Sequence, residues 1–181
     1  MDRLWAPWRM QYIDGIDNGP KSNCFLCDAR DATDERKALV FWRQPHAFAV
    51  LNRFPYNNGH TLIVPTAHKG RLEDLRDEEL LALMTLTRDV MALFRGLVRP
   101  DGFNVGFNFG RTAGAGLPEH LHLHIVPRWN GDTNFMPVLS DTRVISEHLR
   151  ATYGKLKEAL AVKEKSAPIF TDNYLREHLY L

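Results

Sequence analysis

The stretch Glu119–Trp129, EHLHLHIVPRW, places three histidines within five residues, each two positions from the next. Leu121, Leu123 and Ile125 alternate with them, and this alternation predicts a β-strand over His120–Pro127. Because successive side chains of a strand point to opposite faces, we expect the leucines to enter the core and the three imidazoles to share the other face. An ordinary polar face would carry mixed side chains, so the stretch indicates either a metal site or histidine nucleophile chemistry.

The patterns on either side of this strand predict an α+β fold with a mainly antiparallel five-stranded sheet, one long helix and one shorter helix. The expected helical segments are a short helix and loop over Cys24–Ala38, the long helix over Leu72–Val98 and a second helix over Val144–Val162. The other expected strands cover Leu39–Arg43, Ala47–Leu51, Thr61–Val64 and Phe103–Phe109. We expect residues 1–181 to form a single domain, with an N-terminal arm over 1–20 and a C-terminal tail over 166–181.

Composition and charge exclude several classes of protein. The chain has 23 basic and 22 acidic residues and a formal charge of +1, which argues against a nucleic-acid partner but allows a local pocket for a small anion. No segment has the apolar length of a membrane span, so we expect no membrane partner, and the start MDRLWAPWRM lacks the pattern of a secretory signal. The two cysteines do not indicate a secreted disulfide framework. These features predict a cytoplasmic protein.

The cysteines form a Cys-x-x-Cys motif at Cys24 and Cys27. Such a pair either binds a soft cation or acts as a redox dithiol, and the chain lacks the parallel βαβ pattern of the redox motif. A tetrahedral zinc needs two more ligands, and without further cysteines these must be histidines. We favour His68 and His120, with His46 as the substitute for His68, in a closed structural zinc site.

If zinc takes His120, then His122 and His124 remain for another role. A closed site with four protein ligands has no open position for water, so its metal would not be the catalyst. His122 is then the candidate nucleophile, because imidazole attacks phosphorus well at neutral pH when its other nitrogen is held by a hydrogen bond. The glycine-rich loop Gly110–Glu119 could bring backbone N–H groups close to phosphate oxygens.

The histidine stretch resembles the signature of the histidine triad family, His-x-His-x-His followed by two apolar residues. Asn58–Pro65, NGHTLIVP, resembles the segment before the long helix of that family, and the Cys-x-x-Cys, the Pro-x-x-His at Pro65 and His68, and His120 resemble its zinc-binding members. The resemblance runs from about residue 24 to residue 129. The segments LWAPWR, GLPEH and PRWNGDTNFMPV are similar to a prokaryotic branch associated with phosphorolysis or hydrolysis of diadenosine tetraphosphate.

This resemblance implies roles for individual residues. His122 matches the nucleophile that forms a nucleotidyl-histidine, His124 matches a residue beside the phosphates, and His60 matches a histidine that braces the strand carrying the nucleophile. The implied nucleotide-binding positions are Asn52, which would hold the ribose, Asn108, Gly114, Gly116, Leu117 and His124. The family commonly has Gln or Ser/Thr shortly before its triad, whereas this chain has Gly-Leu-Pro-Glu there.

The resemblance implies an enzyme: a nucleotide phosphoanhydride hydrolase or nucleotidyltransferase acting on dinucleoside polyphosphates or nucleoside phosphoramidates. The acceptor would be water or inorganic phosphate. It also implies a homodimer built around the long helix and an edge strand. Two alternatives stay open: a nucleotide-binding module with little catalysis, and a hydrolase in which the three triad histidines bind one metal. The Cys-x-x-Cys motif argues against the second, because it would then lack its histidine partners.

Overall fold

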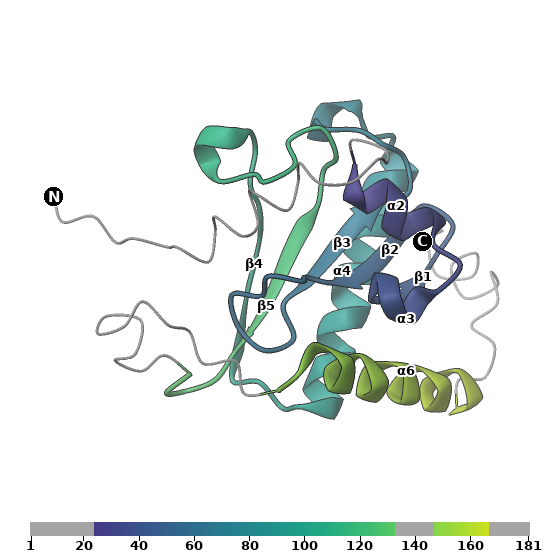
Figure 1. The fold of residues 1–181 in the computed structure, drawn as a ribbon, viewed down its shortest axis with the longest axis vertical. Helices are drawn as coiled ribbons and strands as arrows, with labels where there is room; N and C mark the ends of the chain where they lie inside the picture. Colours follow the sequence, from purple (N-terminus) through teal and green to yellow (C-terminus); the bar gives the residue numbers. More distant parts are fainter. Residues whose placement is uncertain (1–23, 133–146, 167–181) are drawn as a thin grey trace, which may run out of the picture.

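The computed structural model describes residues 24–132 and 147–166, without the side chains of 164–166. Its centre is a five-stranded antiparallel sheet in the order β1-β2-β3-β5-β4 (Figure 1). The strands are β1 Val40–Arg43, β2 Ala47–Leu51, β3 Thr61–Pro65, β4 Gly102–Phe107 and β5 Leu123–Arg128. The helical elements are α2 Phe25–Asp31, α3 Glu35–Ala38, η1 Leu72–Asp74, α4 Asp77–Leu97, η2 Arg111–Ala113 and α6 Leu149–Ser166. The predicted α+β class and five-stranded sheet are confirmed.

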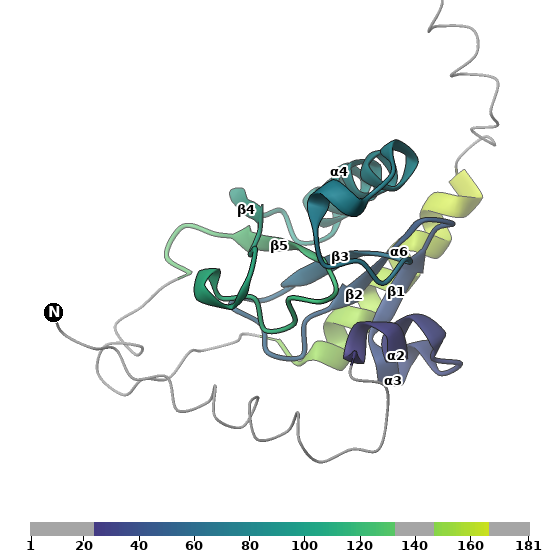
Figure 2. The ribbon, with the colours of Figure 1, turned by 90° about the horizontal axis from the view of Figure 1, so that it is seen from above.

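Helices cover both sides of the sheet. Figure 2 shows α4 on one side and α2 and α3 on the other, and α4 packs on β2 and β3 while α6 contacts α4 and β1. β2 and β3 are buried along their whole length, and their sequences, AFAVL and TLIVP, are accordingly nearly continuous apolar runs. None of the helices in the described residues is both long and apolar enough to span a membrane.

The histidine stretch departs from the predicted strand. β5 begins at Leu123, so His124 is the one triad histidine that lies in it, opposite Leu62 of β3 and Gly106 of β4. The residues before it leave the sheet because Leu121 donates its backbone N–H to the Lys69 carbonyl, at 2.7 Å. The prediction that the strand begins at His120 is therefore wrong, whereas Leu121, Leu123 and Ile125 join the core as predicted.

The predicted long helix is divided in two. α4 begins at Asp77, because Leu75 and Arg76 have extended backbones with ψ of 140° and 158°. Glu79 explains this start: its carboxylate accepts the Arg76 backbone N–H at 2.8 Å and the Lys69 ammonium at 2.7 Å. A glutamate in the first turn of a helix can accept the backbone N–H of the residue before that helix. Here this contact separates η1 from α4.

Other element ends also shift from their predicted positions. β1 begins at Val40, since Leu39 takes a left-handed conformation, with φ of 61°, at the end of α3. β3 extends to Pro65, which pairs with Ala47, and β4 covers 102–107 rather than 103–109. Cys24–Ala38 contains two helices rather than one.

The second predicted helix is displaced toward the C-terminus. It begins at Leu149 rather than Val144, because the Nδ1 atom of His148 accepts the Arg150 N–H at 3.2 Å and caps the first turn. It ends at Ser166, so the first residue of the expected tail is helical. The expected arm, the rest of that tail and residues 144–146 lie outside the described residues.

Gly70 lets the segment before α4 lie against the segment before β5. A Cβ atom at Gly70 would lie 2.6 Å from the Pro118 carbonyl oxygen and 3.1 Å from the Glu119 Cα atom. These neighbours are backbone atoms, which cannot swing aside as the end of a side chain can. The contact adjoins the hydrogen bond from Leu121 to Lys69, so Gly70 helps to fix where the histidine stretch leaves the sheet.

We expect Gly70→Ala to lower the free energy of unfolding by about 1–3 kcal/mol through this clash, measured by urea unfolding. Gly96→Ala is the matched control, since a Cβ atom there has nothing within 4 Å and alanine stabilises helix interiors by up to about 1 kcal/mol. Equal effects of the two substitutions would contradict the close approach.

Candidate functional site

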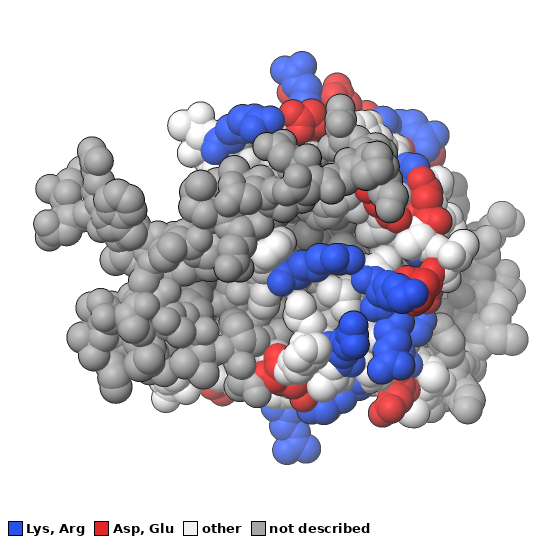
Figure 3. Space-filling model, viewed as in Figure 1, with Lys and Arg blue, Asp and Glu red and all other residues white. Residues whose placement is uncertain are grey.

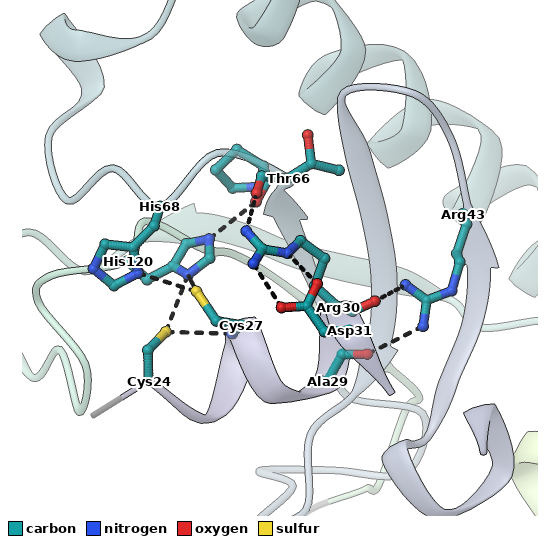
Figure 4. A network of polar contacts seen from close by, with 10 residues as sticks. Cys24, Cys27, Ala29, Arg30, Asp31, Arg43, Thr66, His68 and His120 are labelled. Carbon is teal, nitrogen blue, oxygen red and sulfur yellow. Dashed lines mark hydrogen bonds and ion pairs between the residues drawn. The ribbon is translucent and has the colours of Figure 1, made fainter. Parts of the chain in front are cut away.

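Two cysteines and two histidines from three segments converge at one site (Figure 4). Cys24 and Cys27 lie at the start of α2, His68 follows β3, and His120 precedes β5. The Cys24 Sγ atom lies 3.1 Å from His120 Nδ1, and the Cys27 Sγ atom lies 3.2 Å from His68 Nδ1. All four possible ligand atoms lie within 4.8 Å of one another. The structure thus brings together the four predicted residues, and their donor set fits a tetrahedral divalent metal.

The first turn of α2 directs both sulfurs to the same side. Cys24 is the residue that caps the helix, and its sulfur accepts the backbone N–H of Cys27 at 3.3 Å. A spacing of three residues at a helix start places both side chains on one face. This local geometry is why the motif can present two thiols to one point.

The second nitrogen of His120 shows which atom could bind a metal. His120 Nε2 donates to the Pro65 carbonyl at 2.9 Å, so the lone pair is on Nδ1 and faces the thiols. Metal-binding histidines commonly have their other nitrogen held in this way. Arg30 supports the same backbone by donating to the Thr66 carbonyl at 2.8 Å. Burial raises the pKa of Cys24 to about 11 and lowers the pKa of His120 to about 4, so both groups are neutral at pH 7. A bound cation would leave His120 neutral and favour the thiolate of Cys24.

His122 is held by its own backbone. Its Nδ1 atom donates to the His120 carbonyl at 2.8 Å, which leaves the lone pair on Nε2. The ring is buried, with 8% of the residue exposed, and burial lowers its pKa. We expected a nucleophilic histidine to donate to a backbone carbonyl in this way, and the structure confirms that hydrogen bond for His122.

A chain of hydrogen bonds gives His124 the opposite tautomer. The Tyr56 backbone N–H donates to His60 Nδ1 at 3.0 Å, so His60 carries its proton on Nε2. That proton is donated to His124 Nδ1 at 2.9 Å. His124 therefore carries its own proton on Nε2, a buried atom with no hydrogen-bond partner among the described residues. A buried donor in this state is costly unless a ligand accepts from it.

The two rings place a lone pair beside an N–H donor. The centroids of His122 and His124 are 5.0 Å apart. Burial, followed by the charges of neighbouring histidines, lowers the pKa of His60 to about 3 and of His124 to about 4, so the rings stay neutral at pH 7. One ring can attack an electrophile while the other donates a hydrogen bond to one of its oxygens.

The hypothesis that all three triad histidines bind one metal is wrong. Both nitrogens of His120 face other groups, a carbonyl and the thiols. The Nδ1 atoms of His122 and His124 are likewise occupied, by a carbonyl and by His60. Within 24–132 and 147–166, the one cluster of metal-binding side chains is the Cys/His cluster.

The predicted nucleotide-binding residues fall into two groups. Asn52 lies beside His60, with its Nδ2 atom 3.3 Å from His60 Nδ1 and its Oδ1 atom accepting the Phe54 N–H at 2.9 Å. Asn108 and Gly114 lie together, since a Cβ atom on Gly114 would be 3.8 Å from the Asn108 Nδ2 atom.

In the same loop Gly114 ends η2 in a left-handed conformation, with φ of 93°. Gly116 is exposed, whereas the Leu117 side chain joins the core, so Leu117 can offer a ligand its backbone alone. The nucleotide contacts of these residues and of Asn52 and Asn108 remain predictions.

Sequence reasoning did not identify three residues that support the site. Tyr56 stacks on His124, with centroids 6.0 Å apart and planes at 12°, and Asn57 and Asp132 are joined by a 2.7 Å hydrogen bond. The turn-rich segment at 52–59 could have indicated a tight loop, but no local pattern connects residues 75 positions apart. Trp129 donates its indole N–H to the Val98 carbonyl at 3.2 Å.

Comparison with known proteins gives the family. Residues 33–131 match the family model described as HIT domain. The chain belongs to the HIT domain family. A Mycobacterium tuberculosis protein named AP-4-A phosphorylase is 40% identical over 157 residues, which cover 84% of this chain and 80% of the relative. An uncharacterized HIT-like protein of Methanocaldococcus jannaschii is 35% identical, over 60% of this chain and 81% of the relative.

Solved structures of HIT proteins share this fold. A zinc-bound histidine triad family protein from Mycobacterium smegmatis is 26% identical with a TM-score of 0.63, covering 80% of this chain and 97% of its own. A hypothetical histidine triad nucleotide-binding protein from Sulfolobus tokodaii has a TM-score of 0.64 at 22% identity, covering 81% of this chain and 98% of its own. At that identity the second comparison shows the fold alone.

Acidification should destabilise this HIT protein because its fold keeps His60 neutral. The folded pKa of His60, about 3, lies below its ordinary value of 6.5, so below pH 6.5 protons bind preferentially to the unfolded chain. The free energy of unfolding should therefore fall by up to about 1.4 kcal/mol per pH unit from this residue as pH decreases from about 6.5 to 4. His60→Gln should show a shallower dependence in urea unfolding, and His148→Gln, outside the network, is the control. An unchanged slope in His60→Gln would refute this assignment.

Proposed function

We propose that this HIT protein cleaves dinucleoside polyphosphates through a nucleotidyl-histidine on His122, as a hydrolase or nucleotidyltransferase. The observation that carries the proposal is the pair of opposite tautomers, with a lone pair on His122 Nε2 beside a proton on His124 Nε2. The name of the M. tuberculosis relative, AP-4-A phosphorylase, supports both the substrate class and the reaction type.

In the first step, His122 Nε2 bonds to the α-phosphorus and the bond to the leaving nucleoside polyphosphate breaks. No proton has to move, because the ring keeps its Nδ1 proton and becomes a cationic phosphorylated imidazolium. The His120 carbonyl, already 2.8 Å from Nδ1, stabilises that charge. The leaving oxygen belongs to a phosphate with a last pKa of about 6, so it departs as an anion. A hydrogen bond from His124 Nε2 to the phosphate oxygens is then enough to help the leaving group depart, and no proton transfer is needed.

In the second step, an acceptor oxygen attacks phosphorus, the P–N bond breaks and His122 returns to its neutral form. Inorganic phosphate attacks as an anion and needs no base. Water must lose a proton, which passes to solvent, since burial makes His124 a weak base with a pKa of about 4. Among acceptors, these protonation states favour phosphate, in agreement with the name of the relative.

A surface hollow between α3 and the start of α6 suits an anionic ligand. The hollow, of about 680 Å³, is lined by the basic residues Arg36, Lys37, Arg53 and Arg150, with His148, and by one acidic residue, Asp34, among the described residues. Figure 3 shows Lys and Arg side chains gathered on this face around α3. Arg53 directly follows Asn52 in the chain. On a chain with a formal charge of only +1, such a concentration of positive charge attracts anions to this side of the molecule.

We also propose that Cys24, Cys27, His68 and His120 hold one zinc ion. Zinc bound by four protein ligands would contribute folding energy and hold α2 against the start of β5. The donor set and the zinc-bound M. smegmatis relative support this assignment.

A homodimer is a further part of the proposal. α4 exposes 67% of Leu81 and 56% of Met84, and β4 is an edge strand with exposed residues. An apolar helix face and an open strand edge are both features that proteins usually cover. A second copy of the chain can cover both at once, as expected for a symmetric interface.

We predict that His122→Ala abolishes turnover while nucleotide binding and zinc content stay intact. Loss of a nucleophile typically costs several powers of ten in rate. His124→Ala should slow turnover but still allow some adduct, seen as a nucleotide-sized mass increase after denaturation at alkaline pH. His46→Ala, outside the site, is the control.

Products of diadenosine polyphosphates should be separated by chromatography with and without inorganic phosphate. Near-normal turnover by His122→Ala would rule out the adduct, and a wild-type protein that binds but never turns over would be a binding module.

Purified protein should contain about one zinc ion per chain. Cys24→Ser and His68→Asn should lose both metal and thermal stability, because a structural metal is part of the folding free energy. His46→Asn should keep the metal, since His68 and not His46 joins the cluster. Metal analysis with thermal unfolding tests this, and metal-free protein with an unchanged Tm would exclude a structural site.

A further inference from the structure

We propose that Asp132 is a positioning residue for the histidine pair. It holds the turn Asn52–His60 in the arrangement that gives His124 its Nε2 proton. The inference rests on the proposed function and assigns to it a residue that lies just beyond the family match, which ends at residue 131.

Asp132 is a buried carboxylate surrounded by donors. Its side chain is 8% exposed. Arg128 donates to both of its oxygens, from Nε at 2.6 Å and from Nη2 at 2.8 Å, and the Trp129 N–H donates at 3.1 Å. Charge-assisted, bidentate pairs of this kind have a well-defined geometry. Arg128 is itself part of β5, so Asp132 is fixed relative to the strand that carries His124.

The donor that connects Asp132 to the catalytic side is Asn57. Its Nδ2 atom donates to Asp132 Oδ2 at 2.7 Å and lies 3.2 Å from the Pro127 carbonyl. The Asn57 backbone carbonyl accepts the His60 N–H at 3.2 Å, and its Oδ1 atom accepts the Asn58 N–H at 2.9 Å. A single side chain thus closes the turn and attaches it to the end of β5.

The position of this turn decides which nitrogen of His60 carries a proton. Tyr56, the residue before Asn57, directs its backbone N–H at His60 Nδ1 over 3.0 Å. The Asn52 amide nitrogen lies 3.3 Å from the same His60 Nδ1 atom, and the Phe54 N–H of the turn orients that amide. If the turn moved and both donors were lost, His60 could carry its proton on Nδ1 and accept through Nε2. His124 would then donate from Nδ1, and its Nε2 atom would present a lone pair to the substrate. A displaced turn would therefore replace a hydrogen bond to the phosphate with repulsion.

The test is Asp132→Asn, which preserves size but removes the charge that pairs with Arg128. We expect kcat to fall about tenfold or more, as for other residues that orient a reacting group through one neighbour. In ¹⁵N-labelled protein, the ring nitrogens of His60 and His124 should lose the shifts of a single tautomer. Asp101→Asn is the matched control. Asp101 accepts the N–H of Asn130, two residues before Asp132, at 2.7 Å, and it makes no hydrogen bond to Asn57. Asp101→Asn should leave kcat within about twofold of the wild-type value. The shifts of the ring nitrogens should be unchanged.

Asn57→Ala removes the same contact from its other end and keeps the test available if Asp132→Asn does not fold. The two substitutions together should cost less kcat than their separate effects multiplied, because both break the hydrogen bond between Asn57 and Asp132. Ring-nitrogen shifts that stay as in the wild type in the folded variant would overturn the proposal and leave Asp132 a stability residue only. These shifts are measured without turnover, so they remain decisive if His122→Ala shows that the proposed reaction is wrong.

Discussion

The backbone hydrogen bond from Leu121 to Lys69 divides the three triad histidines between two sites. It removes the residues before Leu123 from the sheet. His120 then turns toward the cysteines, while His124 stays in β5. The Lys69 side chain pairs with Glu79 at the start of α4, so one residue contacts both the longest described helix and the segment that carries the triad histidines.

Burial determines how this site can act. Desolvation lowers the pKa of His60, His122 and His124, so each ring is neutral and has one donor and one acceptor nitrogen. In a neutral histidine, a hydrogen bond at one nitrogen specifies the role of the other. The His120 carbonyl leaves the lone pair of His122 on Nε2, and the Tyr56 N–H, acting through His60, leaves an N–H donor on His124. The tautomers are therefore set by backbone groups, whose positions depend on the fold.

The support of the turn at 52–60 illustrates how widely that dependence extends. Asp132 holds the turn through Asn57, and from another side Thr152 of α6 donates to the Asn58 Oδ1 atom at 3.3 Å. Gly59, with φ of 73°, also approaches Phe94 of α4 so closely that a Cβ atom would lie 2.8 Å from the ring. The turn is thus fixed by elements on several sides, as expected for a segment that must hold one hydrogen-bond donor in place.

The sequence by itself determined the fold class, most of the strand positions and the four members of the Cys/His cluster. These follow from local rules: alternation along a strand, helical spacing, the ligand chemistry of Cys-x-x-Cys and the triad signature. The tertiary structure alone decided where β5 begins, the tautomers of His60 and His124, and the roles of Tyr56, Asn57 and Asp132. Each of these depends on a partner distant in the chain, such as Lys69 for Leu121 or Asp132 for Asn57. Local patterns describe which faces a segment offers, whereas hydrogen-bond partners across the fold are set only when the segments pack.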